Sequence, residues 1–174
     1  MSKTYMEQQI VVGNEGERKF LESYPCFQYN NVKNCKAPDF IHRQTGALAE
    51  LKYDVSKKAK KDKPGKDGKQ INFFVERYSD RDRKTLGGPF RAVEEGVDYY
   101  VYMFKEPKRT FFYNAVKFRD ITEKLIRNGR YEERGITIPN QGWTTSGFPL
   151  PISEFEDAKL SPNVIKKGER FNIS

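Results

Sequence analysis

The sequence has little of what zinc sites and disulfide frameworks require. Its 174 residues include two cysteines, Cys26 and Cys35, which do not form a Cys-x-x-Cys pair, and one histidine, His42. A structural zinc site needs about four such ligands, and a disulfide framework needs several paired cysteines. Neither is indicated, and we expect both cysteines to be reduced structural thiols.

Long apolar runs are also missing. No stretch approaches the ~20 apolar residues of a membrane-spanning helix, and the N-terminus lacks the apolar core of a signal peptide. Internal repeats, a Gly-x-x-x-x-Gly-Lys phosphate loop and a Ser-His-Asp constellation are not visible. We therefore expect a soluble, cytoplasmic protein with no membrane partner, built as one domain over residues 1–174, since 36% hydrophobic content can bury one core.

Positive charge, by contrast, is in excess. The formal net charge is +8 and the isoelectric point is near 9.4. Such a balance favours a polyanionic partner, although a basic protein is too common to specify which one.

Residues 37–54 read as two short strands joined by a tight turn, which predicts a β-hairpin. Its register places Asp39 opposite Glu50. Directly opposed residues have Cβ atoms about 4.5–5.5 Å apart, so both carboxylates can reach one cation. Because side chains alternate along a strand, Lys52 shares the face of Glu50. One face of the hairpin therefore gathers two acids and a lysine.

The same register pairs Phe40 with Ala49 and His42 with Ala47. Strand parity then puts His42 on the face opposite Asp39, which argues against His42 as a metal ligand.

Two carboxylates this close repel each other unless one stays protonated or a cation joins them. Mg²⁺ prefers oxygen ligands, and we expect Mn²⁺ to substitute for it. Such an ion can polarise a phosphoryl oxygen and activate water, while a lysine orients the nucleophile or offsets developing charge. The hairpin therefore indicates phosphodiester hydrolysis, and the alternative is a surface hairpin with ordinary solvated charges.

Residues 4–24 read as an amphipathic helix, opened by Thr4 and Glu7 at capping-box spacing and ended by Pro25. Its apolar stripe consists of Met6, Ile10, Phe20, Leu21 and Tyr24. Steps of three and four residues carry this stripe through Glu17, which predicts a glutamate that points inward. The alternative is a half-exposed glutamate in a region made irregular by its glycines.

Pro38-Asp39, ten intervening residues and Glu50-Leu51-Lys52 resemble the motif of the PD-(D/E)XK nuclease superfamily, which has the restriction-endonuclease-like fold. The resemblance implies that Asp39 and Glu50 bind Mg²⁺, that Leu51 lends a backbone carbonyl, and that Lys52 assists the attacking water. Many members also carry an acidic residue on the first helix, which reaches the metal directly or through water. Glu17 fits that place.

The fold implied by the resemblance is α/β, with a mixed central β-sheet flanked by α-helices. The implied activity is that of a Mg²⁺-dependent DNA endonuclease, similar to Holliday junction resolvases and phage-type structure-selective nucleases. Sequence-specific cleavage of restriction or homing type, cleavage of RNA, and a non-catalytic nucleic-acid-binding module with the same fold remain the alternatives.

Seven lysines lie between positions 57 and 69. Proline and glycine interrupt any periodicity there, so residues 56–70 are predicted to form a basic loop. The run is either a solvated segment or, because it follows the hairpin directly, a contact with the DNA backbone. We favour the DNA contact, through Lys57, Lys58, Lys60, Lys61 and Lys63.

The rest of the chain predicts the remaining core elements. Strands are expected at 71–78, 97–104 and 110–115, a short helix after Pro89, and a helix at 116–128 capped by Asn114.

The segment 130–174, rich in proline, is predicted to be an irregular extension of short strands and loops. Ser153 and Glu156 offer it a last capping box. Trp143 suits either the core or stacking on DNA. Upstream of this segment, Glu76 is either a further acidic ligand or the partner of an arginine.

A homodimer is also expected, because two cuts in a duplex or a junction need two sites. The predicted self-complementary surfaces are the aromatic strand 111–113 and the short helix after Pro89. The alternative is that these aromatic residues belong to the core under the helix at 116–128.

Overall fold

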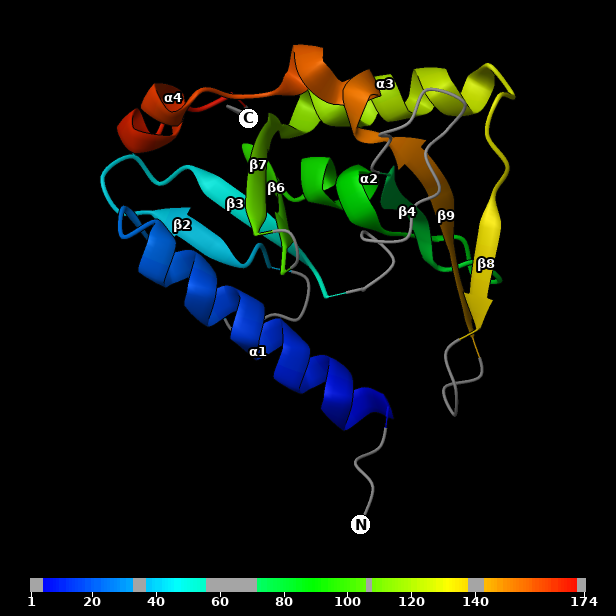
Figure 1. Ribbon diagram of the computed structural model, residues 1–174, viewed down its shortest axis with the longest axis horizontal. Coiled ribbons are helices and arrows are strands. Elements are labelled where there is room, and N and C mark those ends of the chain that lie inside the picture. The colour runs from blue at the N-terminus through cyan, green and yellow to red at the C-terminus, as the bar shows by residue number, and fades with distance from the viewer. Residues whose placement is uncertain (1–4, 33–36, 56–71, 106–107, 138–142, 172–174) are drawn as a thin grey trace.

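The computed structural model describes residues 5–32, 37–55, 72–105, 108–137 and 143–171 (Figure 1). These residues form a five-stranded sheet in the order β1-β2-β3-β6-β7 and a four-stranded sheet in the order β5-β4-β9-β8. The strands of the first sheet are β1 (Phe27–Tyr29), β2 (Phe40–His42), β3 (Leu48–Asp54), β6 (Tyr99–Phe104) and β7 (Arg109–Asn114). Those of the second are β4 (Asn72–Asp80), β5 (Thr85–Leu86), β8 (Arg134–Thr137) and β9 (Thr144–Pro151).

The helices are α1 (Tyr5–Ser23), α2 (Gly88–Glu94), α3 (Ala115–Arg127), α4 (Pro162–Lys167) and the 3-10 helix η2 (Ile152–Ala158). Among the described residues, none of these helices has the length and apolar content that crossing a membrane would require.

The five-stranded sheet is mixed, because β3 and β6 run parallel while the other neighbours run antiparallel. All six residues of β6 are buried, as expected for a central strand covered on both faces. Its side chains alternate between two cores: Tyr99, Val101 and Met103 enter one, and Tyr100, Tyr102 and Phe104 enter the other.

Helices cover the two faces of this sheet, with α1 on one side and α3 on the other (Figure 1). Phe20 of α1 stacks on Phe40 with ring centroids 4.5 Å apart. On the opposite face, Phe118 of α3 stacks on Phe155 of η2 at 4.1 Å. The predicted mixed sheet flanked by α-helices is therefore confirmed.

The predicted helix at 116–128 is present as α3. Asn114 caps it, since its side chain accepts a hydrogen bond from the Lys117 N–H at 2.9 Å. Gly129 follows the helix with a φ of +63°, the left-handed conformation that glycine adopts without strain.

The predicted strand at 71–78 is present as β4, but it belongs to the second sheet and not to the sheet of the hairpin. It pairs antiparallel with β9, and its Phe73 and Val75 lie in the core that also contains Phe148 and Leu150 of β9. The second sheet thus packs on the α3 side of the first sheet.

The segment from residue 130 onward contributes more regular structure than its prolines predict. Strand β9 runs for eight residues although it contains Pro149 and Pro151. Its pairing with β8 ends at Gly147, so beyond that point the described residues place a partner on only one of its edges. Proline is tolerated at such an edge because no ladder hydrogen bond is lost there.

The predicted capping box at Ser153 and Glu156 is wrong. The N-cap of helix η2 lies two residues earlier, at Pro151, and the helix begins at Ile152 with no side-chain capping hydrogen bond.

Both surfaces predicted for a homodimer belong largely to the interior. Phe112 and Tyr113 are buried, and Phe111 packs against the core. Pro89 and Ala92 of α2 are also buried. The fold supports the alternative for Phe111 and Tyr113, which pack in the core under α3, whereas Phe112 packs in the core on the α1 side of the sheet.

The apolar stripe of α1 holds only in its C-terminal half. Phe20 is fully buried, whereas Ile10 is 56% exposed. The N-terminal part of α1 extends beyond the end of β2 (Figure 1), and Ile10 and Val11 are exposed there. Thr4 and the side chain of Glu7, predicted to form a capping box, lie outside the described residues.

Candidate active site

The candidate site begins where β2 stops. Phe40 pairs with Ala49 and Ile41 with Leu48, as the predicted register requires, but Asp39 precedes the strand. Its carboxylate oxygen Oδ2 accepts a hydrogen bond from the Leu51 N–H at 2.8 Å. The Asp39 side chain therefore takes the place of the next backbone acceptor and leaves the rest of that edge of β3 without a strand partner in the described chain.

The orientation of Leu51 follows from the same hydrogen bond. In an extended strand the N–H and C=O of one residue point to the same edge. Since the N–H of Leu51 points at Asp39, its carbonyl oxygen is directed to the edge where the Asp39 carboxylate lies. This is the backbone atom that the family resemblance implies as a ligand.

Glu50, the next residue of interest on β3, is 5% exposed. Its Oε1 accepts from the Lys52 Nζ at 3.2 Å and from the Arg91 Nη2 at 3.3 Å. Its Oε2 is buried and has no hydrogen-bond partner among the described residues. One oxygen of Glu50 is thus held by two cations while the other is unmatched.

A cavity of about 210 Å³ brings the predicted residues together. Glu17 reaches it from α1, Asp39 from the start of β2, and Glu50 and Lys52 from β3. The complete lining is Val12, Gly13, Glu17, Asp39, Glu50, Leu51, Lys52 and Tyr53. All four residues predicted to be catalytic therefore line one cavity, although they lie up to 35 positions apart (52 − 17) in the sequence.

The acids of the cavity repel one another. Burial raises the pKa of Asp39 to about 7, and the charges of Glu50 and Glu17 add to this effect, against the Leu51 N–H and Lys52. Burial, followed by the charge of Glu50, also raises the pKa of Glu17. The site holds more negative charge than its own cations compensate.

Lys52 keeps its proton. Burial lowers the pKa of its ammonium, but the carboxylates of Glu50, Glu76 and Asp39 outweigh that effect and place the pKa above its ordinary value. Lys52 is therefore a hydrogen-bond donor and a positive charge at neutral pH, not a base.

These features fit a divalent cation with oxygen ligands. The buried unpaired Oε2 of Glu50, the Asp39 carboxylate and the Leu51 carbonyl are hard donors of the kind that Mg²⁺ takes. Among the described residues, however, no three His, Cys, Asp or Glu side chains are grouped so as to hold a metal ion. Glu17 thus joins the cavity without completing a three-carboxylate centre.

Sequence reasoning missed Arg91. It lies on α2, 41 positions after Glu50, and no local pattern links a helix arginine to a strand that distant. Only the folded position of α2, which packs against β4 and α3, brings this arginine to Glu50. The position of the helix itself, after Gly87-Gly88-Pro89, was predictable from those residues.

Glu76 does not line the cavity, and among the described residues it forms no ion pair with an arginine. Its Oε1 accepts a hydrogen bond from the Gly88 N–H at 3.1 Å at the start of α2. Gly88 has a φ of +49°, and a Cβ there would collide with the backbone of Glu76, so glycine is required. Glu76 therefore fixes α2 to β4.

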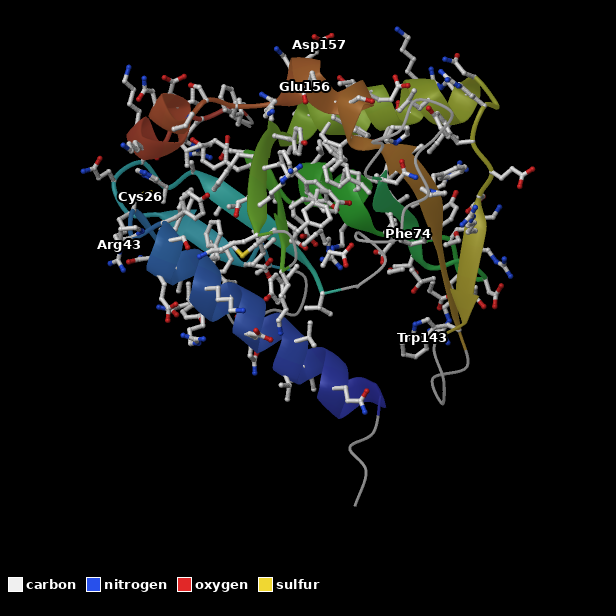
Figure 2. The ribbon with its side chains drawn as sticks, viewed as in Figure 1. Cys26, Arg43, Phe74, Trp143, Glu156 and Asp157 are labelled. Carbon is white, nitrogen blue, oxygen red and sulfur yellow. The ribbon has the colours of Figure 1, made fainter. Side chains whose placement is uncertain are left out.

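Three other predicted residues stand apart from the cavity. His42 is buried on the opposite face, edge-on to Phe27 and 3.2 Å from the Thr45 hydroxyl, as strand parity predicts. Trp143 is 39% exposed at the start of β9 (Figure 2), so it is not a core residue. Cys26 is a free, half-buried thiol whose pKa is raised by burial.

The predicted DNA-contacting lysines, Lys57, Lys58, Lys60, Lys61 and Lys63, lie outside the described residues, as does Cys35.

Comparison with known proteins gives no match: no family model, no curated protein and no solved structure is significantly similar to this chain. The function of the site is therefore argued from its own chemistry.

Proposed function

We propose that this chain is a Mg²⁺-dependent DNA endonuclease with a restriction-endonuclease-like core. The observation that carries the proposal is the cavity in which Glu17, Asp39, Glu50 and Lys52 converge from three separate elements. The arrangement of the first sheet supports it too, because the hairpin β2–β3 is followed by the parallel strand β6, with α1 and α3 on opposite faces.

The residues that would hold the ion are Asp39, Glu50 and Leu51, the last through its carbonyl. When bound, Mg²⁺ supplies charge compensation for the acids and a Lewis acid for a phosphoryl oxygen. The protonated Lys52 lies 3.2 Å from Glu50 and is placed to orient a water molecule or to offset charge on the phosphate. Glu17, less tightly grouped, suits a role through an intervening water.

The substrate class follows from charge and size. A net charge of +8 favours a polyanion. The single-domain size resembles that of structure-selective nucleases of the Holliday junction resolvase type, which we propose as the more specific activity. Sequence-specific DNA cleavage, RNA cleavage and nucleic-acid binding without cleavage are distinguished from it by the experiment below.

The test is to incubate the purified protein with supercoiled plasmid, a four-way DNA junction and a structured RNA, in Mg²⁺, Mn²⁺ or EDTA. We expect cleavage of DNA in either metal, preference for the junction, and no cleavage in EDTA. Asp39→Asn, Glu50→Gln and Lys52→Ala should each lower the rate at least about 100-fold, because each removes a metal ligand or a positioned charge.

The matched control is Glu123→Gln, which removes a carboxylate from an exposed ion pair with Arg127 on α3. It should cleave as the parent does. Cleavage by Asp39→Asn near the parental rate, or cleavage that persists in EDTA, would overturn the proposal, and binding without cleavage would favour the non-catalytic alternative.

A further inference from the structure

Arg91 connects the candidate site to a second element of the fold. From α2, its Nη2 donates to Glu50 Oε1 at 3.3 Å, while its Nε forms an ion pair with Glu95 Oε1 at 3.5 Å, one helical turn further along. The arginine side chain is 30% exposed, and its ion-pair partner Glu50 is buried. The guanidinium therefore bridges the end of α2 and the middle of β3.

The geometry of this bridge restricts the Glu50 carboxylate. Oε1 receives two donors, Lys52 from the same strand and Arg91 from α2, whereas the buried Oε2 has no hydrogen-bond partner in the described chain. A carboxylate held by one oxygen from two directions has little freedom to rotate about its terminal bond. Oε2 is thus the oxygen left for a further ligand.

Helix α2 is itself held in place. The Gly88 N–H donates to Glu76 Oε1 at 3.1 Å and the Gly87 N–H to the Arg77 carbonyl at 2.9 Å, which ties the start of α2 to β4 of the second sheet. Arg91 lies within the first turn and a half of the helix. The second sheet therefore fixes the position from which Arg91 reaches Glu50.

We propose that Arg91 is a positioning residue: by holding Glu50 Oε1, it presents Oε2 to the divalent cation. This inference rests on the proposed function, because it concerns the ligand of the same metal. Arginine suits this position because its extended fork spans two acids: Nη2 donates to Glu50, and Nε lies 3.5 Å from Glu95 as an ion pair without a hydrogen bond. The single ammonium of a lysine cannot reach both acids at once.

The test measures metal affinity directly, by titrating Mn²⁺ into the DNA-free protein and following free Mn²⁺ by electron paramagnetic resonance. Arg91→Gln should raise the Mn²⁺ dissociation constant about 10- to 100-fold, the usual effect of removing a residue that orients a metal ligand. Arg91→Lys should also bind more weakly than the parent. At saturating Mn²⁺ the cleavage rate of Arg91→Gln should return to within a few-fold of the parental rate, since the effect is on affinity.

The control variant is Arg127→Gln, which removes an arginine from an exposed arginine–glutamate pair on α3. Its Mn²⁺ affinity should equal that of the parent. Circular dichroism establishes that each variant is folded. If Arg91→Gln does not fold, Glu95→Gln supplies the same test, because it loosens the guanidinium without leaving the buried Glu50 opposite a neutral side chain, and a smaller rise in the dissociation constant is expected.

The outcomes separate the two proposals. A parental protein that binds no Mn²⁺, or an Asp39→Asn variant that binds it as the parent does, overturns the metal site and with it the role of Arg91. If the parent binds and Asp39→Asn does not, an unchanged affinity in Arg91→Gln overturns the positioning role alone. So does a cleavage defect that saturating Mn²⁺ leaves uncorrected.

Discussion

Asp39 performs two functions that oppose each other. Its carboxylate replaces a backbone acceptor for the Leu51 N–H, and it adds negative charge beside Glu50 and Glu17. Without a cation, burial disfavours the ionised form, the charges of Glu50 and Glu17 add to that effect, and the pKa of Asp39 rises from 3.8 to about 7. In the metal-free protein at neutral pH, the ionised Asp39 therefore destabilises the folded state.

This shift predicts a pH dependence of stability. Between about pH 4 and pH 7 the folded protein binds a proton at Asp39 that the unfolded chain has released, so this group lowers the free energy of unfolding as the pH rises through that window. Asp39→Asn removes the titration, while the amide oxygen can still accept from the Leu51 N–H. In EDTA the variant should melt above the parent near pH 8.

The measurement is the melting temperature of both proteins in EDTA at a series of pH values. The difference in favour of Asp39→Asn should shrink as the pH falls and vanish near the ordinary pKa of an aspartate. Two melting curves separated by the same interval at every pH would show that Asp39 is not destabilised by its neighbours.

The sequence predicts the positions of some residues of the site and not of others. Asp39, Glu50 and Lys52 lie on one hairpin, whose turn length fixes the register, so their approach was predictable from local rules. The position of Glu17 was predictable from the helix period, given a helix that packs near the hairpin. Arg91 depends on a contact across 41 positions between elements whose packing no periodicity specifies, and the sequence does not disclose it.

At the scale of elements, α1 is placed against β3 by a close contact at one glycine. A methyl group at Gly16 would lie about 2.5 Å from Cγ of Tyr53, whereas one at Gly13 would meet no atom within 4 Å. The Tyr53 hydroxyl also accepts from the Lys19 Nζ at 3.1 Å, on the next turn of the helix. The absence of a side chain at Gly16 thus lets the helix approach the strand and bring Glu17, its neighbour in sequence, to the cavity.

Alanine at these two glycines should have opposite effects. Gly13→Ala should increase the free energy of unfolding by about 0.5–1 kcal/mol, because alanine favours the helix. Gly16→Ala gains the same propensity but forces Tyr53 to move, and it should lower stability by about 1–3 kcal/mol. Urea unfolding of both variants beside the parent measures the effect, and an increase for both would mean that α1 does not depend on this contact.

Elements were predicted well where one period dominates and less well where pairing partners must be chosen. The apolar run of β6 and the capped helix α3 follow from local signals. The membership of β4 in a second sheet does not, because it depends on β9, whose prolines read as strand breakers. These prolines are compatible with a strand because the pairing of β9 with β8 ends at Gly147, before Pro149 and Pro151, so no hydrogen bond to β8 is lost there.

At the scale of the whole molecule, the first sheet is enclosed on both faces by aromatic side chains. The aromatic residues 111–113, which the sequence offers for a dimer surface, complete these two cores. Phe111, for example, lies edge-on to Phe73 of the second sheet, with centroids 6.3 Å apart. Composition alone could not decide between a dimer interface and the core for residues 111–113, because an aromatic strand suits both equally well.

Under the proposed function, the burial of these aromatic residues changes the course of cleavage that we expect. The described residues contain one candidate site, and under the proposed function one such site would cut one strand of a duplex at a time. If the chain is a monomer, two cuts need two independent binding events. We therefore expect supercoiled plasmid to become a nicked circle first and linear only later, with an initial nicking rate proportional to protein concentration, and light scattering at micromolar protein to give a mass near 20.3 kDa. Linear plasmid at the earliest times, together with a mass near twice that value, would mean that the chain pairs through a surface other than strand β7 and helix α2.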